Sequence, residues 1–332
     1  MKKIFIILAL VAIVSVVWLA STNNFFKKEP VPVIKIGILY KGANFKQVAD
    51  GFMQGFSKNL PKDRKVEYII KDEPGSEQND YDLTAQVLVD NKVDLIVAIG
   101  IEPVRAAEKV TATNKIPVIL ELGINPVTQG IIESFQRPGG NITGVTFQAE
   151  ELTGKRLEFL KMIDPSVKHI TIFRKKKTDI MDVPLQYLTP VAKIMGVTVT
   201  IRDFSDLAEL QKEVLATTAS NTDAIFYAPD PFVQRNSELI IKHAIEQKLP
   251  VMFHEDFITK NGATASYGAN FSAAGKQGAR LALKVLIDKQ PIAEIPAEAV
   301  SRIDFIINLV NARAIGLSIP DDIISLAQGV IK

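Results

Sequence analysis

Short apolar runs alternate with segments of helical spacing along most of this chain, and no other feature of the sequence limits its fold as strongly. Between Val33 and Leu122, strands and helices follow one another in the order βαβαβαβ. One of these strands, Asp94–Gly100, is almost wholly apolar, as expected for a strand that helices cover on both faces. The alternation therefore predicts a parallel, doubly wound sheet.

A second series of the same kind follows a helix that we expect at Ala149–Ile163. Its helices include Phe232–Gln247, the long Ala273–Asp288 and a closing helix at Pro320–Val330. Its strands are expected at Lys168–Phe173, Val197–Ile201, Asp223–Ala228, Leu249–Phe253 and Arg302–Leu309. Two such units predict an α/β fold with two lobes, and clefts between lobes are preferred ligand sites.

The first series ends in a stretch that favours ligand binding, Pro117–Phe147. A strand at Pro117–Leu122 is followed by Gly123 and by Asn125-Pro126, where we expect another helix to begin. The turn residues 137–141 then lead into a strand at Thr143–Phe147. Two loops in quick succession beside strand ends are what a ligand crevice in an open α/β sheet requires.

A set of loop residues stands at the predicted carboxyl ends of the strands, which meet at one edge of each sheet. In the first unit they are Tyr40, Gly100, Ile101, Glu102, Gly123 and Asn125, and in the second they are Arg174, Asp230, His254, Glu255, Tyr267, Asn270 and Phe271. We expect a small ligand to bind among them.

These residue types suit a ligand that carries a carboxylate, an ammonium group and a ring. The helix starts at Pro103 and Pro126 offer backbone N–H groups and a positive dipole end, which suit a carboxylate. Carboxylate side chains would balance an ammonium group, and aromatic side chains would pack a ring. The acidic candidates are Glu102, Asp230 and Glu255, and the aromatic candidates are Tyr40, Tyr267 and Phe271.

The composition argues against several classes of protein. The chain has no Cys, which excludes thiol catalysis, disulfides and thiolate metal sites, and its three His are far apart in sequence. His254-Glu255-Asp256 lacks zinc-ligand spacing, and no phosphate-cradling or nucleophile-elbow motif is present. A net charge of +2 gives no electrostatic reason to expect nucleic acid. We therefore expect no enzyme activity, no metal, no cofactor and no nucleic-acid partner.

One basic run, Arg174–Lys177, is expected to be a solvated loop, with phosphate or partner binding as the alternative.

The N-terminus carries an export signal. Lys2 and Lys3 precede Ile4–Ala20, a run of seventeen residues without a charge, and polar residues follow. This pattern indicates either a cleaved signal peptide or an uncleaved membrane anchor, and both interpretations place the body of the protein outside the cytoplasm. We assign residues 1–22 to this segment and 23–33 to a linker.

Five stretches carry the motifs of a known family. They are DLIVAIGIEPVRAA (94–107), IPVILELGINPVTQGII (116–132), RPGGNITGVT (137–146), ELTGKRLEFLK (151–161) and INLVNARAIGLSIPDDII (307–324). The stretches resemble substrate-binding proteins of ABC transporters, in the type I periplasmic-binding class, and within it the group of tryptophan- and tyrosine-binding proteins. This resemblance implies two Rossmann-like lobes with three crossovers and a ligand cleft that closes by hinge motion.

The resemblance also implies lobe boundaries and ligand contacts. It places 34–147 with 268–300 in one lobe and 148–267 with 301–332 in the other. By position, the family's contacts correspond to Tyr40, Gly100, Ile101, Glu102, Gly123, Asn125, Thr146, Arg174, Asp230, Glu255, Tyr267 and Asn270. The family usually has Thr or Ser in place of Ile101-Glu102 and Asp in place of Asn125, so we expect these differences to affect which ligand binds.

The function implied by the resemblance is solute capture for an ABC importer. The solute would be a small molecule, by first choice an amino acid and an aromatic one, delivered to a permease and its ATPase. We expect a monomer at the periplasmic or extracellular face of the cytoplasmic membrane, attached to it if Ile4–Ala20 is uncleaved. The alternative is a membrane-anchored ligand-sensing domain that signals to a partner instead of feeding a permease.

Overall fold

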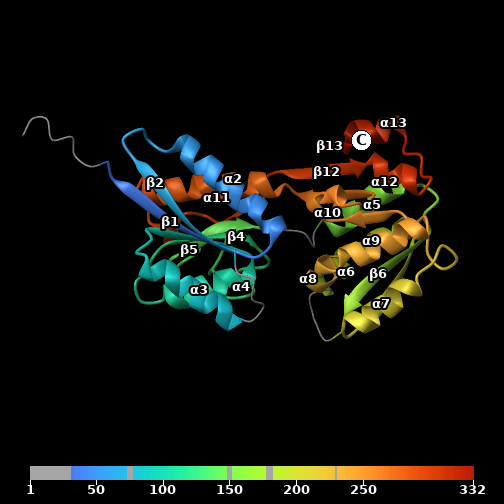
Figure 1. Cartoon of the computed structure of the whole chain (residues 1–332), viewed down its shortest axis with the longest axis horizontal. Helices are drawn as coiled ribbons and strands as arrows, with labels where there is room; N and C mark the ends of the chain where they lie inside the picture. Colours follow the sequence, from blue (N-terminus) through green and yellow to red (C-terminus); the bar gives the residue numbers. More distant parts are fainter. Residues whose placement is uncertain (1–30, 73–77, 148–151, 177–181, 229) are drawn as a thin grey trace, which may run out of the picture.

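The chain forms two α/β lobes that lie side by side along the long axis of the molecule (Figure 1). The computed structural model describes residues 31–332, except 73–77, 148–151, 177–181 and 229. Each lobe has one mostly parallel sheet with helices on both faces, and this confirms the predicted α/β fold class. The predicted export segment lies outside the described residues.

The sheet of lobe 1 has the strand order β11-β5-β4-β3-β1-β2. Its strands are β1 Val33–Tyr40, β2 Lys65–Asp72, β3 Leu95–Ile99, β4 Val118–Gly123, β5 Ile142–Thr146 and β11 Glu298–Ala299. Every residue of β3, β4 and β5 is buried, which explains why these runs are so apolar. Neighbouring strands in this sheet are parallel, so their carboxyl ends share one edge.

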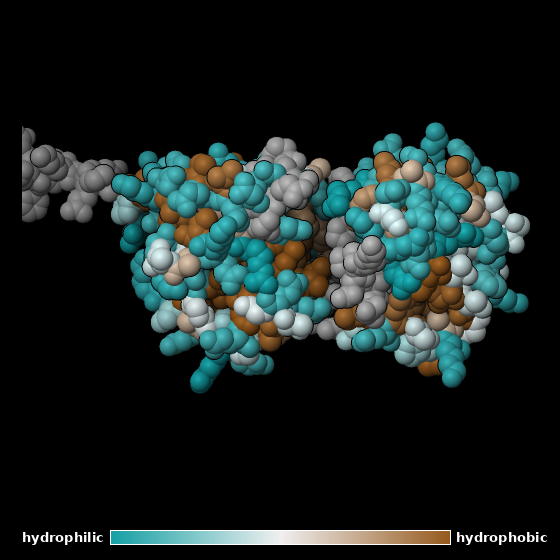
Figure 2. Space-filling view, turned by 90° about the horizontal axis from the view of Figure 1, so that it is seen from below, coloured by the Kyte–Doolittle hydropathy of each residue, from teal (hydrophilic) through white to brown (hydrophobic). Residues whose placement is uncertain are grey.

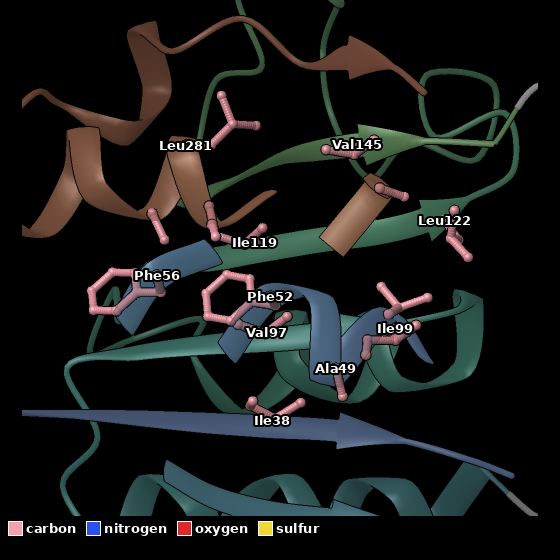
Figure 3. Close-up of a cluster of buried hydrophobic side chains, with 14 of the residues drawn as sticks. Ile38, Ala49, Phe52, Phe56, Val97, Ile99, Ile119, Leu122, Val145 and Leu281 are labelled. Atoms are coloured by element: carbon pink, nitrogen blue, oxygen red, sulfur yellow. The ribbon is translucent and has the colours of Figure 1, made fainter. Parts of the chain in front are cut away.

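Helices cover both faces of the lobe 1 sheet (Figure 1). The helices α2 Ala43–Asn59 and α11 Phe271–Leu286 lie on one face, and α3 Gln78–Asp90 and α4 Ile101–Val110 lie on the other. Figure 3 shows the rings of Phe52 and Phe56 among aliphatic side chains of the sheet, and both rings are fully buried. Burying a side chain of this size stabilises a fold by roughly 1.5–3 kcal/mol.

Glycines let α2 and α11 approach each other closely. A Cβ atom on Gly51 would lie 2.2 Å from the carbonyl oxygen of Ser272, and one on Gly275 would lie 2.0 Å from that of Val48. No other residue fits at either position without moving a backbone. This contact brings α11, which comes from late in the sequence, into the core of lobe 1.

The sheet of lobe 2 has the strand order β13-β12-β10-β9-β8-β6-β7. Its strands are β6 His169–Lys175, β7 Thr198–Phe204, β8 Ala224–Phe226, β9 Val251–Phe253, β10 Ala265–Ala269, β12 Ile303–Asn308 and β13 Gly329–Ile331. The strand β12 runs antiparallel to β10, so the sheet is not wholly parallel as the alternation predicted. Its helices are α5 Thr153–Ile163, α6 Asp182–Ile194, α7 Leu207–Leu215, α8 Pro231–Arg235, α9 Ser237–Glu246, α10 Asp256–Lys260, α12 Leu309–Ala314 and α13 Asp321–Leu326.

The chain passes between the two sheets three times. It leaves lobe 1 after β5, returns from β10 to α11, and leaves again from β11 to β12. The second crossing follows Ala269, because β10 pairs with β12 as far as Ala269. The boundary that we predicted between residues 267 and 268 therefore falls inside a strand.

Two predicted helices were wrong in extent. The segment Phe232–Gln247 forms two helices, α8 and α9, because Asn236 leaves helical geometry (φ −107°, ψ 18°) and its side-chain amide donates to the Phe232 carbonyl at 2.8 Å. The segment Pro320–Val330 is helical only over α13. Beyond it, the backbone of Gln328 pairs with Phe305, and β13 completes the edge of the sheet beside β12.

Within the described residues, none of the helices combines the length and the apolar character that crossing a membrane requires.

Candidate ligand-binding site

The strand ends of the two lobes face each other across a hollow. Figure 2 shows the molecule indented between the lobes, with apolar side chains gathered on the lobe 1 side of the indentation. Phe147, which follows β5, touches His254, which follows β9, with ring centroids 5.6 Å apart. The carboxyl edges of both sheets therefore meet at this hollow, where ligands bind in folds of this kind.

Lobe 1 contributes the start of α4 to the site. Gly100 precedes the helix with φ at +92°, a conformation that favours glycine, and no side chain caps the first turn. The first N–H groups of a helix have no partner within it, so the turn at Ile101 and Glu102 can receive an anion. The ring of Phe45 lies 3.4 Å from where a Gly100 Cβ atom would be, and it screens this turn.

The loop after β4 differs from the prediction. Residues 126–135 form successive turns, so no helix begins at Pro126 and no helix dipole acts there. Asn125 adopts a left-handed conformation (φ +46°), and the backbone reverses again at Gly130 (φ +67°). Asn125 is exposed at the edge of the hollow, and Gly123 ends β4 beside Thr146 of β5.

Two predicted contacts of lobe 1 have structural roles in this conformation. Tyr40 is packed in the lobe core, where burial and the charge of Asp72 raise the pKa of its phenol. Thr146 is buried, and its hydroxyl donates to the carbonyl of Glu298 at 3.3 Å, which holds β11 against β5. Both residues are almost fully buried in this conformation.

Lobe 2 presents charged side chains that are held by neighbours. Arg174 binds Asp203 through two hydrogen bonds, at 2.6 and 2.8 Å, and this contact lowers the pKa of the Asp203 carboxyl. Asp230 caps α8 by accepting from the N–H groups of Phe232 (2.8 Å) and Val233 (3.2 Å). Its second oxygen accepts from Lys175 N–H at 3.3 Å. Asp230 is thereby fixed in place.

A second carboxylate of lobe 2, Glu255, is almost fully buried and accepts a hydrogen bond from the side-chain amide of Gln234. The guanidinium of Arg156, on α5, is fully buried nearby and donates to the carbonyl of Tyr227 at 3.2 Å. Burial and the charges of Glu255 and Asp230 raise the pKa of Tyr227, and Arg156 lowers it. Two carboxylates and one guanidinium therefore surround the same tyrosine beneath the edge of the site.

The last two predicted contacts lie to the side of the hollow. Tyr267 packs its ring on Phe159 of α5, at 4.7 Å between centroids, and is partly buried against the core of lobe 2. Asn270 sits at a crossover, caps α11 through Ala273 N–H, and donates to Asp304 at 2.6 Å. These residues hold the lobes and their connection in position.

Aromatic rings form a continuous line from one lobe to the other. In lobe 1, Phe45 stacks on Phe271 at 6.0 Å, and Phe271 meets Phe147 edge to face at 6.0 Å. Phe147 then contacts His254 of lobe 2, which stacks on Tyr227 at 4.8 Å. We call these five residues the aromatic line. Four of the five are buried in this conformation, and aromatic rings of this kind can pack a ligand ring.

Other candidate sites are not supported by the geometry. In the part of the chain that the structure describes, no group of His, Asp and Glu side chains is arranged to hold a metal ion. In the basic run, Arg174 and Lys176 form ion pairs, and the ammonium of Lys175 lies 4.6 Å from the Phe232 ring centroid. Lys177 lies outside the described residues.

Sequence comparison decides which family this architecture represents. The family model described as ABC transporter substrate binding protein matches residues 34–331, nearly the whole described chain. The chain belongs to this family. Its members bind solutes and are not enzymes, and the resemblance inferred from the motifs is thereby confirmed.

Several proteins are similar to this ABC substrate-binding protein over most of its length. A tyrosine-binding protein of Clostridioides difficile (strain R20291) is 27% identical over 272 residues, which cover 81% of this chain and 77% of that protein. The ABC domain in complex with L-Trp from Streptococcus pneumonia has a TM-score of 0.75 at 21% identity and covers 90% of this chain and 99% of its own. A ligand-free, open substrate-binding protein from Clostridium difficile has a TM-score of 0.70 at 22% identity, with the same coverage. The two structures establish the shared fold.

Sequence reasoning missed several residues of this substrate-binding protein's cleft. The sequence pattern predicts Phe147 as the last residue of a strand. In the structure β5 ends at Thr146, so Phe147 lies just beyond it at the carboxyl edge. Phe45 stands in the first turn of α2. Only its closeness in sequence to the loop at Gly42 could have suggested that it lies near the site. Glu121 and Arg156 lie beneath the edge of each lobe, and no sequence pattern distinguished them from surface charges.

Proposed function

We propose that this chain is the extracytoplasmic solute-binding component of an ABC importer and that it captures an aromatic amino acid by closing its lobes. The observation that carries the proposal is the family match over residues 34–331, on a fold whose two strand edges face each other. Tyrosine and tryptophan are named for the relatives, and the aromatic line supplies surfaces that suit such rings.

The proposed pose uses both lobes. The first turn of α4 at Ile101 and Glu102 receives the ligand carboxylate, because the positive end of the helix dipole favours an anion. Asp230 or Glu255 receives the ammonium group. An ionised carboxylate has about four acceptor positions, so Asp230 can accept from a ligand in addition to its three backbone donors.

The remaining predicted contacts are proposed to shape the cleft. They are Tyr40, Gly100, Gly123, Asn125, Thr146, Arg174, Tyr267 and Asn270. Partners would be a permease and its ATPase, and the chain would act as a monomer outside the cytoplasm. The N-terminal segment would either be cleaved or hold the protein at the membrane.

Isothermal titration of the full chain with L-tyrosine and L-tryptophan tests the proposal. Binding without turnover is expected, and Asp230→Asn or Glu255→Gln should weaken it by about ten-fold or more, because an ionic hydrogen bond to the ammonium is lost. Asp206→Asn is the matched control, since Asp206 caps α7 in the same way on an exposed surface. Unchanged affinity in both site variants, or no binding of either amino acid, would refute the proposal.

A further inference from the structure

His254 is the member of the aromatic line that keeps an unused polar atom. The residue is 4% exposed, and its Nδ1 atom is buried with no hydrogen-bond partner among the described residues. The hydroxyl of Tyr227, by contrast, bonds to the backbone of Asp230 as donor and as acceptor. The three phenylalanines of the line carry no polar atom. If a ligand ring packs against this line, His254 is therefore the member that can form a hydrogen bond with it.

The imidazole is held in a fixed place between the lobes. Tyr227 stacks on it from lobe 2, and Phe147 contacts it from lobe 1. The backbone below is fixed too, because a Cβ atom on Gly268 would lie 1.7 Å from the His254 carbonyl oxygen. A side chain confined in this way can select a partner by geometry, since little conformational freedom is lost when it binds.

The imidazole is also uncharged. Burial, and then the positive charge of Arg156, hold the pKa of His254 well below its usual range. A neutral imidazole has one N–H donor and one nitrogen acceptor. A phenol hydroxyl both donates and accepts, so it can pair with this ring whichever nitrogen carries the proton.

We propose that His254 hydrogen-bonds a hydroxyl group on the ring of the ligand, so that the cleft prefers a hydroxylated aromatic amino acid over its unsubstituted analogue. This inference rests on the proposed function and names the feature of the solute that the site reads. It assigns to His254 a specificity role, and to Phe147 and Tyr227 the role of holding its ring.

L-Tyrosine and L-phenylalanine are the appropriate probes because they differ by the single ring hydroxyl. Titration of the full chain should show L-tyrosine binding roughly ten-fold more tightly, the usual effect of one hydrogen bond in a buried site. His254→Phe keeps a ring for Phe147 and Tyr227 to pack against and removes both nitrogens, so the two affinities should become equal. His169→Phe makes the same change at an exposed position, the first residue of β6, which is the end away from the cleft. It should preserve the preference for L-tyrosine over L-phenylalanine.

The outcomes separate this inference from the function on which it rests. If L-tyrosine and L-phenylalanine bind equally to the wild type, or if the preference survives in His254→Phe, the role of His254 is refuted while the binding function stands. If neither amino acid binds to the wild type, the proposed function itself fails.

A measurement on the unmutated protein covers the case in which His254→Phe does not fold. The chain has three histidines, so ¹⁵N-histidine labelling gives three imidazole signals. L-Tyrosine should shift the ring nitrogens of His254 by more than L-phenylalanine does, and leave those of His169 unmoved. Equal shifts of His254 with both ligands would contradict the inference.

Discussion

Glu121 in lobe 1 and Arg156 in lobe 2 are both fully buried, but their surroundings differ. In lobe 1, Glu121 of β4 is fully buried, and neither of its oxygens has a hydrogen-bond partner among the described residues. In lobe 2, Arg156 of α5 is equally buried, but it bonds to the Tyr227 carbonyl and shares Tyr227 as a neighbour with two carboxylates. A buried charge needs such compensation, so Glu121 must be neutral where Arg156 remains charged.

The same contrast holds at the surface of the cleft. The edge of lobe 1 offers backbone groups and rings at Gly100, Asn125 and Phe147, with few charges. The edge of lobe 2 offers charged side chains that neighbours hold in place, at Arg174 and Asp230. One lobe is thus suited to an anionic end and a ring, and the other to a cationic end. A ligand with both kinds of group would bind to both lobes and favour their closure.

The largest effect is expected from Arg156→Met. This change removes the buried positive charge of Arg156 from lobe 2. The carboxyl groups of Asp230 and Glu255 near Tyr227 are then left without that charge to balance them. The free energy of unfolding should fall by about 3 kcal/mol, because removing the buried cation leaves nearby buried carboxyl groups uncompensated. Urea denaturation of the full chain measures this value. Arg156→Lys, which keeps the charge, should lose less. If Arg156→Met were more stable than the wild type, the charge of Arg156 would not be compensated, and the contrast with Glu121 would fail.

Glu121→Met should act in the opposite direction. Oε1 of Glu121 packs against Gly278 of α11, and removing an unsatisfied carboxyl there should stabilise the fold by roughly 1–3 kcal/mol at pH 8. Thermal or urea unfolding gives the difference. Loss of stability in Glu121→Met would contradict the account, since it would mean that the carboxyl makes a favourable interaction.

The stability of the fold should depend on pH through Glu121. Burial raises the pKa of Glu121 well above 4.5, so the unfolded chain loses this proton first as the pH rises. The contribution of Glu121 to stability is therefore fully present below about pH 4.5 and is lost as the pH rises from there through the folded-state pKa. Glu121→Gln, which cannot ionise, should show a flatter stability curve above pH 5 than the wild type. Parallel curves for the two proteins would exclude a neutral Glu121.

The smallest effect is expected from Asp203→Asn on the surface of lobe 2. The ion pair with Arg174 is bidentate but partly exposed, so its loss should cost less than about 1 kcal/mol, and added salt should reduce the difference. Urea denaturation at low and high salt measures it. If the loss were above about 2 kcal/mol, the Arg174–Asp203 pair would contribute nearly as much to stability as Arg156, and the contrast between buried and surface charges would fail.

Much of the fold could be predicted from the sequence because buried parallel strands leave a strong pattern. The run Asp94–Gly100 is apolar at nearly every position, and β3 lies within it. The turns after Asn125 and the break at Asn236 could not be predicted, because they depend on single backbone angles that the apolar spacing does not report. The strand β13 replaced the end of a predicted helix because β12 needed an edge partner, which is a tertiary requirement.

The site was predictable in position more than in detail. Strand ends indicated the carboxyl edges of the two sheets, and Gly100, Asn125, Asp230 and Glu255 follow strands at those edges. The sequence did not indicate that Thr146 would hold β11 or that Tyr40 would be packed in the core, since both depend on which face of a strand end is covered. Glu121 and Arg156 were unpredictable for the same reason, because charged residues are usually exposed.

The proposed function requires that an aromatic amino acid bridges two unlike edges and closes the lobes. Because the chain has no Cys, two introduced cysteines, Asp63→Cys in lobe 1 and Lys212→Cys in lobe 2, can carry a fluorescent donor and acceptor without further changes. We predict that L-tyrosine or L-tryptophan shortens the distance between these labels, with the same concentration dependence as binding measured by titration. Binding with no change in the distance, or a distance that neither amino acid alters at any concentration, would contradict the account.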